Sequence, residues 1–326
     1  MSSGTHLHRS LGHPLIYLAK QRIQKLPHPL FLRIFYVWFF FRKMLRAEYV
    51  RHKAGLPLLS AVDLRKHKRS NVLFILGTGP SINHISPKRW QAISRHDTVG
   101  VNFWLYHRFV PKFYITESAS YVDHGDAICR RMTEAANWRG SEYGDTIKII
   151  TDLYQNGRQW PLDLDPAFRK NLYAAYDLPI PARTEPEFEY GIQYLLHKGL
   201  FDSATEIRVL FKYAQSLSVL LTFAFRLRYR KVVLCGIDMK TNDHFYDDAE
   251  LYPEAAWAKE WCSSATWEYD DQFLWGIRQS CAAYSMKRLL FDPAGIQLYV
   301  ENRSSALWPR IPEAPAILFA DEGGDP

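Results

Sequence analysis

The sequence predicts an α/β fold built on one mostly parallel sheet, and three observations predict it. Short, fully apolar runs alternate with helical patterns from residue 70 onward. Glycine or polar residues follow these runs directly. Of the 326 residues, 47% are hydrophobic and 23% are charged, which is enough apolar material to bury a sizeable core. Such alternation is typical of a parallel sheet that helices cover on both faces.

The composition argues against several classes of protein. The chain has four cysteines: Cys129, Cys235, Cys262 and Cys281. Their spacing contains no CxxC pair, so it indicates neither a disulfide scaffold nor a zinc ribbon, and it fits a reducing compartment. No apolar run reaches the roughly 18 residues of a spanning helix, so we do not expect a multi-pass membrane protein.

The positive charge is concentrated near the N-terminus. Residues 1–69 hold 14 Lys and Arg against two acidic residues, whereas residues 70–326 hold 27 basic against 32 acidic residues. The net charge of +7 therefore combines a leader of +12 with a body of −5. Phosphate contacts need a basic face on the folded domain, so the acidic body argues against nucleic acid as a partner.

Residues 1–69 are predicted to form a basic, aromatic leader. Residues 29–41 read PLFLRIFYVWFFF, and the basic segment RKMLR follows at once. This stretch is too short to span a bilayer, but an amphipathic helix of this composition suits an anionic membrane surface. We therefore expect a peripheral protein on the cytoplasmic face of the inner membrane. The alternative is a helix that packs on the body with its charges solvated.

The first strand is predicted at Val72–Leu76, a fully apolar run. The turn after it consists of Gly77, Thr78, Gly79, Pro80 and Ser81. Glycine permits close approach of the backbone to a ligand, and proline suits the first position of a helix. A strand, a glycine turn and a helix N-terminus form an anion site of the dinucleotide-binding type. The turn lacks the lysine that a Walker loop requires.

Five further strands are predicted at 98–101, 113–115, 148–150, 232–235 and 296–300. The residues that follow them are, in order, Asn102, Thr116, Thr151, Gly236 to Asp238, and Glu301. Residues 217–227 are apolar on nearly all sides and are predicted to form a buried helix. Ligands of parallel sheets bind beyond the carboxyl ends of the strands, so the site is predicted at these polar ends.

The predicted domain spans residues 70–310, and residues 311–326 are predicted to be a flexible tail. Residues 239–280 interrupt the alternation of strands and helices, because they are rich in aromatic and acidic residues and contain no β-like run. We interpret this segment as a lid over the site. A peripheral insertion is the alternative.

Five motifs follow one another along the body. They are ILGTGPSI at 75–82, VGVNFWLYHRF at 99–109, KFYITES at 112–118, VVLCGIDMKTNDHFYDD at 232–248 and QLYVENRSSAL at 297–307. In this order they resemble the bacterial sialyltransferases of glycosyltransferase family 42. The pattern also occurs in relatives that modify flagellin and in pterin pyrophosphokinase-like proteins.

The resemblance implies a single Rossmann-like domain, a variant of the GT-A fold. It also implies a CMP-activated acidic sugar as donor, such as sialic acid, Kdo or a related ulosonic acid, and a glycan or glycolipid as acceptor. Transfer in the family inverts the anomeric carbon and needs no metal. The resemblance therefore implies a sialyltransferase-like enzyme of cell-surface polysaccharide biosynthesis, without a cofactor.

The resemblance also implies roles for particular residues. The nucleotide and the reacting groove are assigned to the following positions: Gly77, Thr78, Gly79, Ser81, Asn102, Thr116, Ser216, Asp238 and Ser305. For Asp238 the alternative is a loop cap. The family has two phosphate-binding tyrosines, of which the first aligns with Lys240 and the second falls at Phe245 or Tyr246. A cation such as Lys240 is expected to stabilise the leaving phosphate.

The identity of the catalytic base stays open. The family uses a lid histidine, but all twelve histidines of this chain lie at or before His244. The base is therefore His244, within NDHFYDD, or a lid carboxylate, namely Glu268, Asp270 or Asp271. A histidine suits the deprotonation of a sugar hydroxyl. We expect the acidic neighbours of His244 to raise its pKa by stabilising the imidazolium.

Two other functions fit the same motifs. A pyrophosphokinase-like, nucleotide-dependent transferase would need Mg²⁺ and clustered carboxylates, which Asp238, Asp247 and Asp248 could supply. A non-catalytic binding relative would keep the fold and lose the base, as the missing lid histidine allows. Similarity of fold alone does not decide among these functions.

Overall fold

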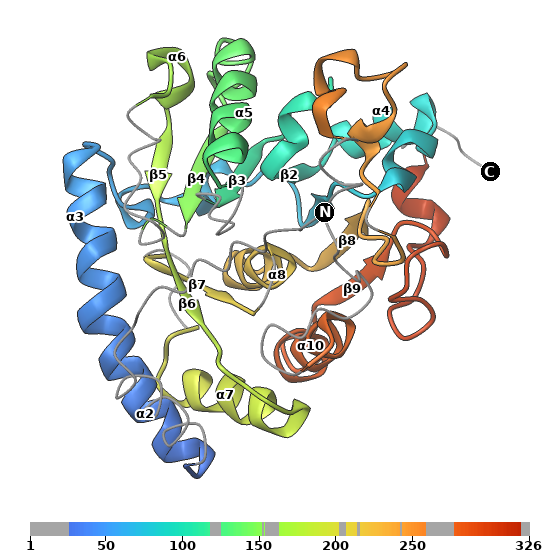
Figure 1. Cartoon of the computed structure of the whole chain (residues 1–326). Helices are drawn as coiled ribbons and strands as arrows, with labels where there is room; N and C mark the ends of the chain where they lie inside the picture. Colours follow the sequence, from blue (N-terminus) through green and yellow to red (C-terminus); the bar gives the residue numbers. More distant parts are fainter. Residues whose placement is uncertain are drawn as a thin grey trace, which may run out of the picture.

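A seven-stranded sheet forms the centre of the molecule, and every neighbouring pair of its strands is parallel. The computed structural model describes residues 26–117, 125–151, 153, 163–201, 207–213, 216–241, 243–258 and 277–320 (Figure 1). The strand order is β5-β4-β3-β2-β1-β8-β9. The strands are β1 Val72–Leu76, β2 Asp97–Val101, β3 Phe113–Glu117, β4 Ile147–Thr151, β5 Leu172–Ala174, β8 Lys231–Cys235 and β9 Gln297–Val300.

This sheet confirms the predicted α/β fold with a mostly parallel sheet. Each of the six predicted strands corresponds to a strand of the sheet, and β1 has the predicted bounds. The prediction missed β5 and a separate pair of parallel strands, β6 Tyr176–Pro179 and β7 Val209–Lys212. These strands are short: β5 and β7 each hold only three consecutive apolar residues, and β6 contains Asp177 and Pro179.

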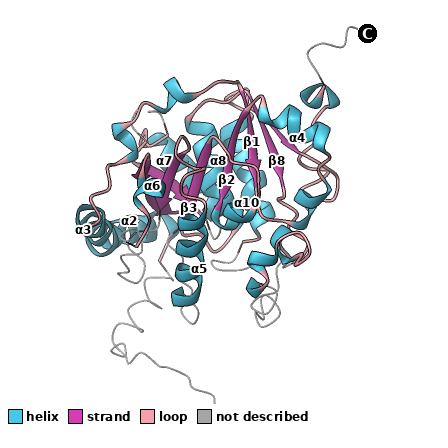
Figure 2. Cartoon of the chain, turned by 90° about the horizontal axis from the view of Figure 1, so that it is seen from above, coloured by secondary structure: helices cyan, strands magenta, loops and turns pink. Residues whose placement is uncertain are grey.

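Helices cover both faces of the sheet, in a Rossmann-like arrangement (Figures 1 and 2). One face packs against α4 Pro87–Ser94, α5 Gly125–Trp138 and α6 Pro166–Arg169. The other face packs against α7 Glu185–His197, α8 Ser216–Arg226 and α10 Gln279–Met286. Side chains of β1 alternate between the two cores, because successive residues of a strand point to opposite faces. The buried helix predicted at 217–227 is α8, in which every residue after Ser216 is buried.

The described part of the leader begins with one long helix and continues through short 3-10 turns at Leu59–Ala61 and Leu64–His67. The helix consists of α2 His28–Phe39, a π-helical turn at Phe40–Met44 and α3 Leu45–Lys53. Phe31, Leu32, Phe39, Ala47 and Val50 face the body and are buried. After the helix, a main-chain bridge joins Leu58 to Ala174 beside β5. Within the described residues, no helix combines the length and the apolar character needed to cross a bilayer.

The flexible tail predicted at 311–326 is wrong for residues 311–320. A parallel bridge pairs Glu313 with Val300, and the backbone N–H of Ala314 donates to the Val300 carbonyl at 2.8 Å. Ile311, Leu318 and Phe319 are buried. The prediction overlooked the apolar run AILFA at 316–320, whose Leu318 and Phe319 are buried. Residues 321–326 lie outside the described residues.

Candidate functional site

The candidate site lies where the order of the strands reverses along the sheet. From β1 the chain builds β2, β3, β4 and β5 on one side, whereas β8 and β9 lie on the other. Connections that leave two neighbouring parallel strands in opposite directions create a crevice at their carboxyl ends. Here those ends carry the glycine turn at 77–81 and the loop at 236–241, so the predicted motifs meet at the expected edge of the sheet.

These two loops are in direct contact, and the contact explains the glycines. The backbone N–H of Gly77 donates to the Cys235 carbonyl and that of Gly79 to the Gly236 carbonyl, both at 2.8 Å. A Cβ atom on Gly77 would lie 2.5 Å from the Gly236 oxygen, and one on Gly79 would lie 2.4 Å from Asp238 Oδ2. The glycines were predicted to let the backbone approach a ligand closely. In the structure they permit, at least in part, close approach to a neighbouring loop of the same chain.

Ser81, Asp238 and Ser305 are brought together, and they bond to protein groups. Asp238 accepts from the Ser81 backbone N–H at 2.9 Å and from the Ser81 hydroxyl at 2.6 Å. Asp238 is therefore a cap for the turn that begins at Pro80. The Ser305 hydroxyl donates to the Ile237 carbonyl at 2.6 Å. These three residues form a fixed frame that joins the ends of β1, β8 and β9.

His244 folds back over the glycine turn. Its Nδ1 lies 3.2 Å from the Thr78 hydroxyl oxygen, and the next backbone N–H, from Phe245, donates to the Thr78 carbonyl at 2.8 Å. The imidazole stacks on Tyr246 with 4.9 Å between ring centroids. Burial lowers the pKa of His244 to about 4 and outweighs the carboxylate of Asp243, so the expected upward shift is wrong. The imidazole is therefore neutral at pH 7.

Lys240 and Tyr246, the other predicted catalytic residues, lie in different environments. Lys240 is exposed and follows Met239, whose φ is 54°. Tyr246 is 3% exposed and packs edge-on against Phe103. Lys240 is therefore free to reach a ligand from solvent, whereas Tyr246 supports the ring of His244.

A second polar group forms at the ends of β2 and β3. Asn102 has a φ of 49°, which is left-handed backbone that asparagine tolerates. Its amide donates to the Ser216 hydroxyl oxygen at 3.1 Å, and its Oδ1 accepts from the Glu117 backbone N–H at 3.3 Å. Lys212 forms an ion pair with Glu117 at 2.8 Å. Asn102 and Ser216 thus lie together, as the resemblance implies.

Thr116 lies on the other face of the sheet. It is fully buried, and its hydroxyl contacts Met132 Sδ of α5 at 3.8 Å. Its neighbour Glu117 has the opposite orientation and joins the group around Asn102. The sequence located the polar end of this strand, which includes Glu117, but the site role was assigned to Thr116 and not to Glu117.

The predicted lid is described only in part. Its carboxylates Glu268, Asp270 and Asp271 lie outside the described residues. The described part packs beside the site, since Trp257 Nε1 donates to the Tyr106 hydroxyl and Tyr252 donates to Asn83 Oδ1, both at 3.1 Å.

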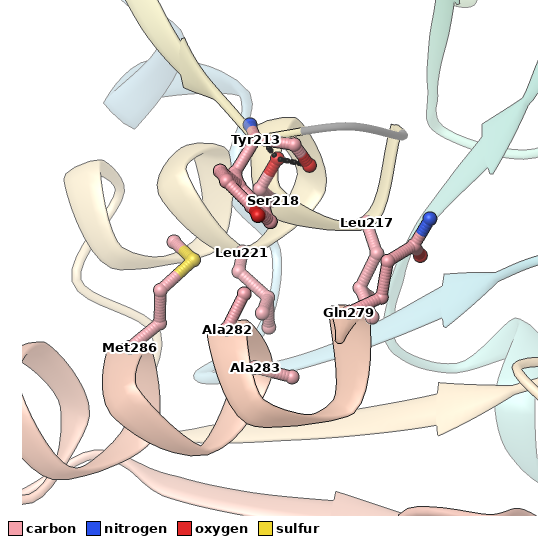
Figure 3. Close-up of a pocket in the computed structure, with 8 residues that line it drawn as sticks. All are labelled: Tyr213, Leu217, Ser218, Leu221, Gln279, Ala282, Ala283 and Met286. Carbon is pink, nitrogen blue, oxygen red and sulfur yellow. Dashed lines mark hydrogen bonds between the residues drawn. The ribbon is translucent and has the colours of Figure 1, made fainter. Parts of the chain in front are cut away.

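Two hollows differ in what they can hold. A hollow of about 480 Å³ lies beside the turn at Pro80–His84. Its walls include four aromatic residues: Trp90, Tyr106, Trp138 and Tyr252. A void of about 10 Å³ lies between α8 and α10, where Ser218 bonds to the main chain of Tyr213 (Figure 3). The first has the volume of a small-molecule site, whereas the second is at the lower limit for one water.

Comparison with known proteins gives no relative from which to transfer a function. No protein-family model matches the chain, and a search of curated proteins finds no significant match.

Gly79→Ala should destabilise the fold, because the added methyl group would overlap Asp238 and the Gly236 oxygen. Overpacking of this kind costs about 1–3 kcal/mol of the free energy of unfolding. Gly144→Ala is the matched control, since its added Cβ would meet only the Ser141 oxygen, at 3.3 Å. Denaturant unfolding of the two variants measures the difference. Equal stability of the two would show that the loop contact tolerates a side chain.

His244 should make stability depend on pH. Its folded pKa of about 4 lies below its ordinary value of 6.5, so the unfolded state binds more protons between these values. This contribution is fully present above pH 6.5 and is lost as the pH falls toward 4. The urea midpoint of the wild type should therefore drop more between pH 7 and pH 5 than that of His244→Gln. Replacement of the exposed His84 is the control. Equal drops in wild type and His244→Gln would contradict the assignment.

Proposed function

We propose that this chain is an inverting, metal-independent glycosyltransferase that takes an acidic sugar from a CMP-activated donor. One observation carries the proposal. The motifs that resemble family 42 are far apart in sequence, yet Thr78, Asn102, Ser216 and Asp238 all gather at the carboxyl edge of one parallel sheet. Nucleotide ligands of such sheets bind at this edge.

The predicted site residues form two sets, of which one holds the loops in place and the other can contact a ligand. Ser81, Asp238 and Ser305 hold the loops through bonds to protein. Half-buried Thr78 and Ser216, with exposed Lys240, have the exposure to meet a nucleotide. Lys240 is proposed to stabilise the charge of the leaving CMP. The aromatic hollow beside the turn at Pro80–His84 is suited to an acceptor glycan, since aromatic rings and a few polar groups are typical of ligand pockets.

His244 is the proposed base, supported by Tyr246. The imidazole is neutral at pH 7 and therefore able to accept a proton from an acceptor hydroxyl. A pKa near 4 makes it a weaker base than a free imidazole, so Glu268, Asp270 and Asp271 stay as alternatives. Substitution of each residue in turn distinguishes His244 from the three carboxylates better than the pH dependence of activity does.

The arrangement of the three carboxylates that would hold Mg²⁺ argues against the pyrophosphokinase-like alternative. Both oxygens of Asp238 accept bonds from Ser81. Asp247 Oδ2 accepts from the His244 backbone N–H at 2.6 Å, and Asp248 Oδ1 accepts from two backbone N–H groups. These bonds shape the loops, and among the described residues no three His, Cys, Asp or Glu side chains cluster closely enough to hold a metal ion together.

We also propose that the leader helix places the enzyme on an anionic membrane surface. Its outer side exposes a row of large apolar residues: Leu30, Ile34, Val37, Trp38, Phe40, Phe41, Leu45 and Tyr49. Arg33, Arg42, Arg46 and Lys53 on the same helix are also exposed. Apolar side chains that enter the acyl boundary, together with cations at headgroup level, suit binding to anionic lipid.

The donor is tested by release of CMP from CMP-sialic, CMP-Kdo, CMP-legionaminic and CMP-pseudaminic acids. Lys240→Ala should lower turnover with the accepted donor about 10²-fold, as expected for loss of a charge-stabilising group, and Lys240→Arg should retain part of it. Lys88→Ala, at another exposed lysine, is the control.

A thermal-shift screen with CMP or ATP, with and without Mg²⁺, identifies the nucleotide. Stabilisation by ATP and Mg²⁺ alone would contradict the proposal, and CMP binding without turnover would indicate a non-catalytic relative.

Membrane binding is tested with vesicles that contain phosphatidylglycerol. Trp38→Ser together with Phe41→Ser should reduce the bound fraction at least tenfold, because it removes two side chains exposed by 42% and 64% from the row. Trp138→Ser together with Ile317→Ser is the control, with exposures of 58% and 73% away from the helix. High salt should also release the wild type. Equal binding by both double variants would refute the proposed surface.

A further inference from the structure

Two buried oxygen atoms at the carboxyl edge of the sheet have no hydrogen-bond partner among the residues that the structure describes. They are Glu117 Oε1 and Thr151 Oγ1. Thr151 is fully buried, whereas 17% of the Glu117 side chain is exposed. Buried polar atoms in folded proteins are nearly always hydrogen-bonded, since an unpaired one has lost its water without compensation. Two such atoms near one another therefore call for an explanation.

The two residues are direct neighbours across the sheet. Glu117 ends β3 and Thr151 ends β4, and the strand register pairs them. Ile115 and Ile149, two residues earlier in each strand, lie in the same core as α8. Because strand side chains alternate between faces, Glu117 and Thr151 point to that face too, from neighbouring strands whose backbones lie about 4.8 Å apart.

Other contacts hold Glu117 and leave one oxygen available. Its Oε2 accepts from Lys212 Nζ at 2.8 Å. Its backbone N–H donates to Asn102 Oδ1 at 3.3 Å, and the Asn102 amide bonds to Ser216 at 3.1 Å. The carboxylate is thus fixed through one oxygen and the main chain. Oε1 is thus left as an acceptor on the residue that the strand register pairs with Thr151.

We propose that Glu117 and Thr151 form a subsite for the ring hydroxyls of a sugar. A carboxylate oxygen only accepts hydrogen bonds, whereas a threonine hydroxyl both donates and accepts. A pair of ring hydroxyls can donate to Glu117 and exchange a bond with Thr151, which satisfies both atoms. A fully ionised phosphate or carboxylate group has no hydrogen to donate to Glu117. The inference rests on the proposed function only for the source of the ring, which is either the ribose of the nucleotide or an acceptor pyranose.

The stability of the free protein gives the first test. Thr151→Val replaces an unpartnered hydroxyl by a methyl group of similar size, so the midpoint of thermal unfolding should stay equal or rise. Thr146→Val is the matched control, because the buried Thr146 hydroxyl donates to the Pro111 carbonyl at 2.8 Å. Its midpoint should fall. An equal fall in both variants would show that Thr151 is already satisfied, and would overturn the subsite.

Binding gives the second test, measured by calorimetry with CMP and 2′-deoxy-CMP and by saturation-transfer NMR with methyl pyranosides. Thr151→Val and Glu117→Gln should each weaken binding of the hydroxylated probe at least tenfold, while Thr146→Val should not. A loss for CMP but not for 2′-deoxy-CMP identifies the ribose, and a loss for the pyranosides alone identifies the acceptor.

The outcomes separate this inference from the proposed function. Suppose that the wild type binds a pyranoside, that Glu117→Gln weakens this binding, and that no cytidine nucleotide binds. This result would refute the CMP donor and support the subsite. Unchanged binding of every probe by both variants would overturn the subsite and leave the donor proposal intact. Failure of the wild type to bind any hydroxylated probe would overturn the subsite as well.

Discussion

The close contact between the loops after β1 and β8 is the constraint on which the candidate site depends. Gly77, Gly79 and Gly236 bring two backbones within hydrogen-bonding distance, and a Cβ at any of them would overlap the opposite loop or its packing partner Ile82. This contact allows Asp238 to reach Ser81. The carboxyl ends of β1 and β8 are thereby joined, and Thr78 is left at the surface of a rigid turn.

The segment at 244–247 shows how this frame controls chemistry. Its backbone and the His244 ring both bond to Thr78, so the imidazole is held between the glycine turn and Tyr246. Desolvation then favours the neutral ring, despite the acidic residues nearby. Sequence alone shows the charges around a histidine but not its burial, and in this segment burial has the larger effect on the pKa.

The sheet was predictable because strands buried on both faces must be apolar throughout, which β1 shows most clearly. The same rule explains why β6, which carries Asp177 and Pro179, was missed. It does not explain the error at 311–320, because that segment contains the apolar run AILFA at 316–320. At the end of β3 the sequence located the polar residues but not their faces. Whether Thr116 or Glu117 turns toward the site depends on which face of β3 packs against α5 and which against α8, and only the fold shows this.

The two groups of polar residues at the sheet edge differ in how completely their atoms are hydrogen-bonded, and this difference indicates that they have different roles. Around β1 and β8, the capping bonds of Asp238 and Ser305 are made within the protein, so that group contributes stability and geometry. Around β3 and β4, Glu117 and Thr151 each keep an oxygen that no described residue pairs with. Free energy for binding is most available where the folded protein has left polar atoms unpaired, because a ligand then gains bonds without breaking any. Recognition of a ligand is therefore expected to depend more on the strand ends of β3 and β4 than on the glycine turn that first indicates the site.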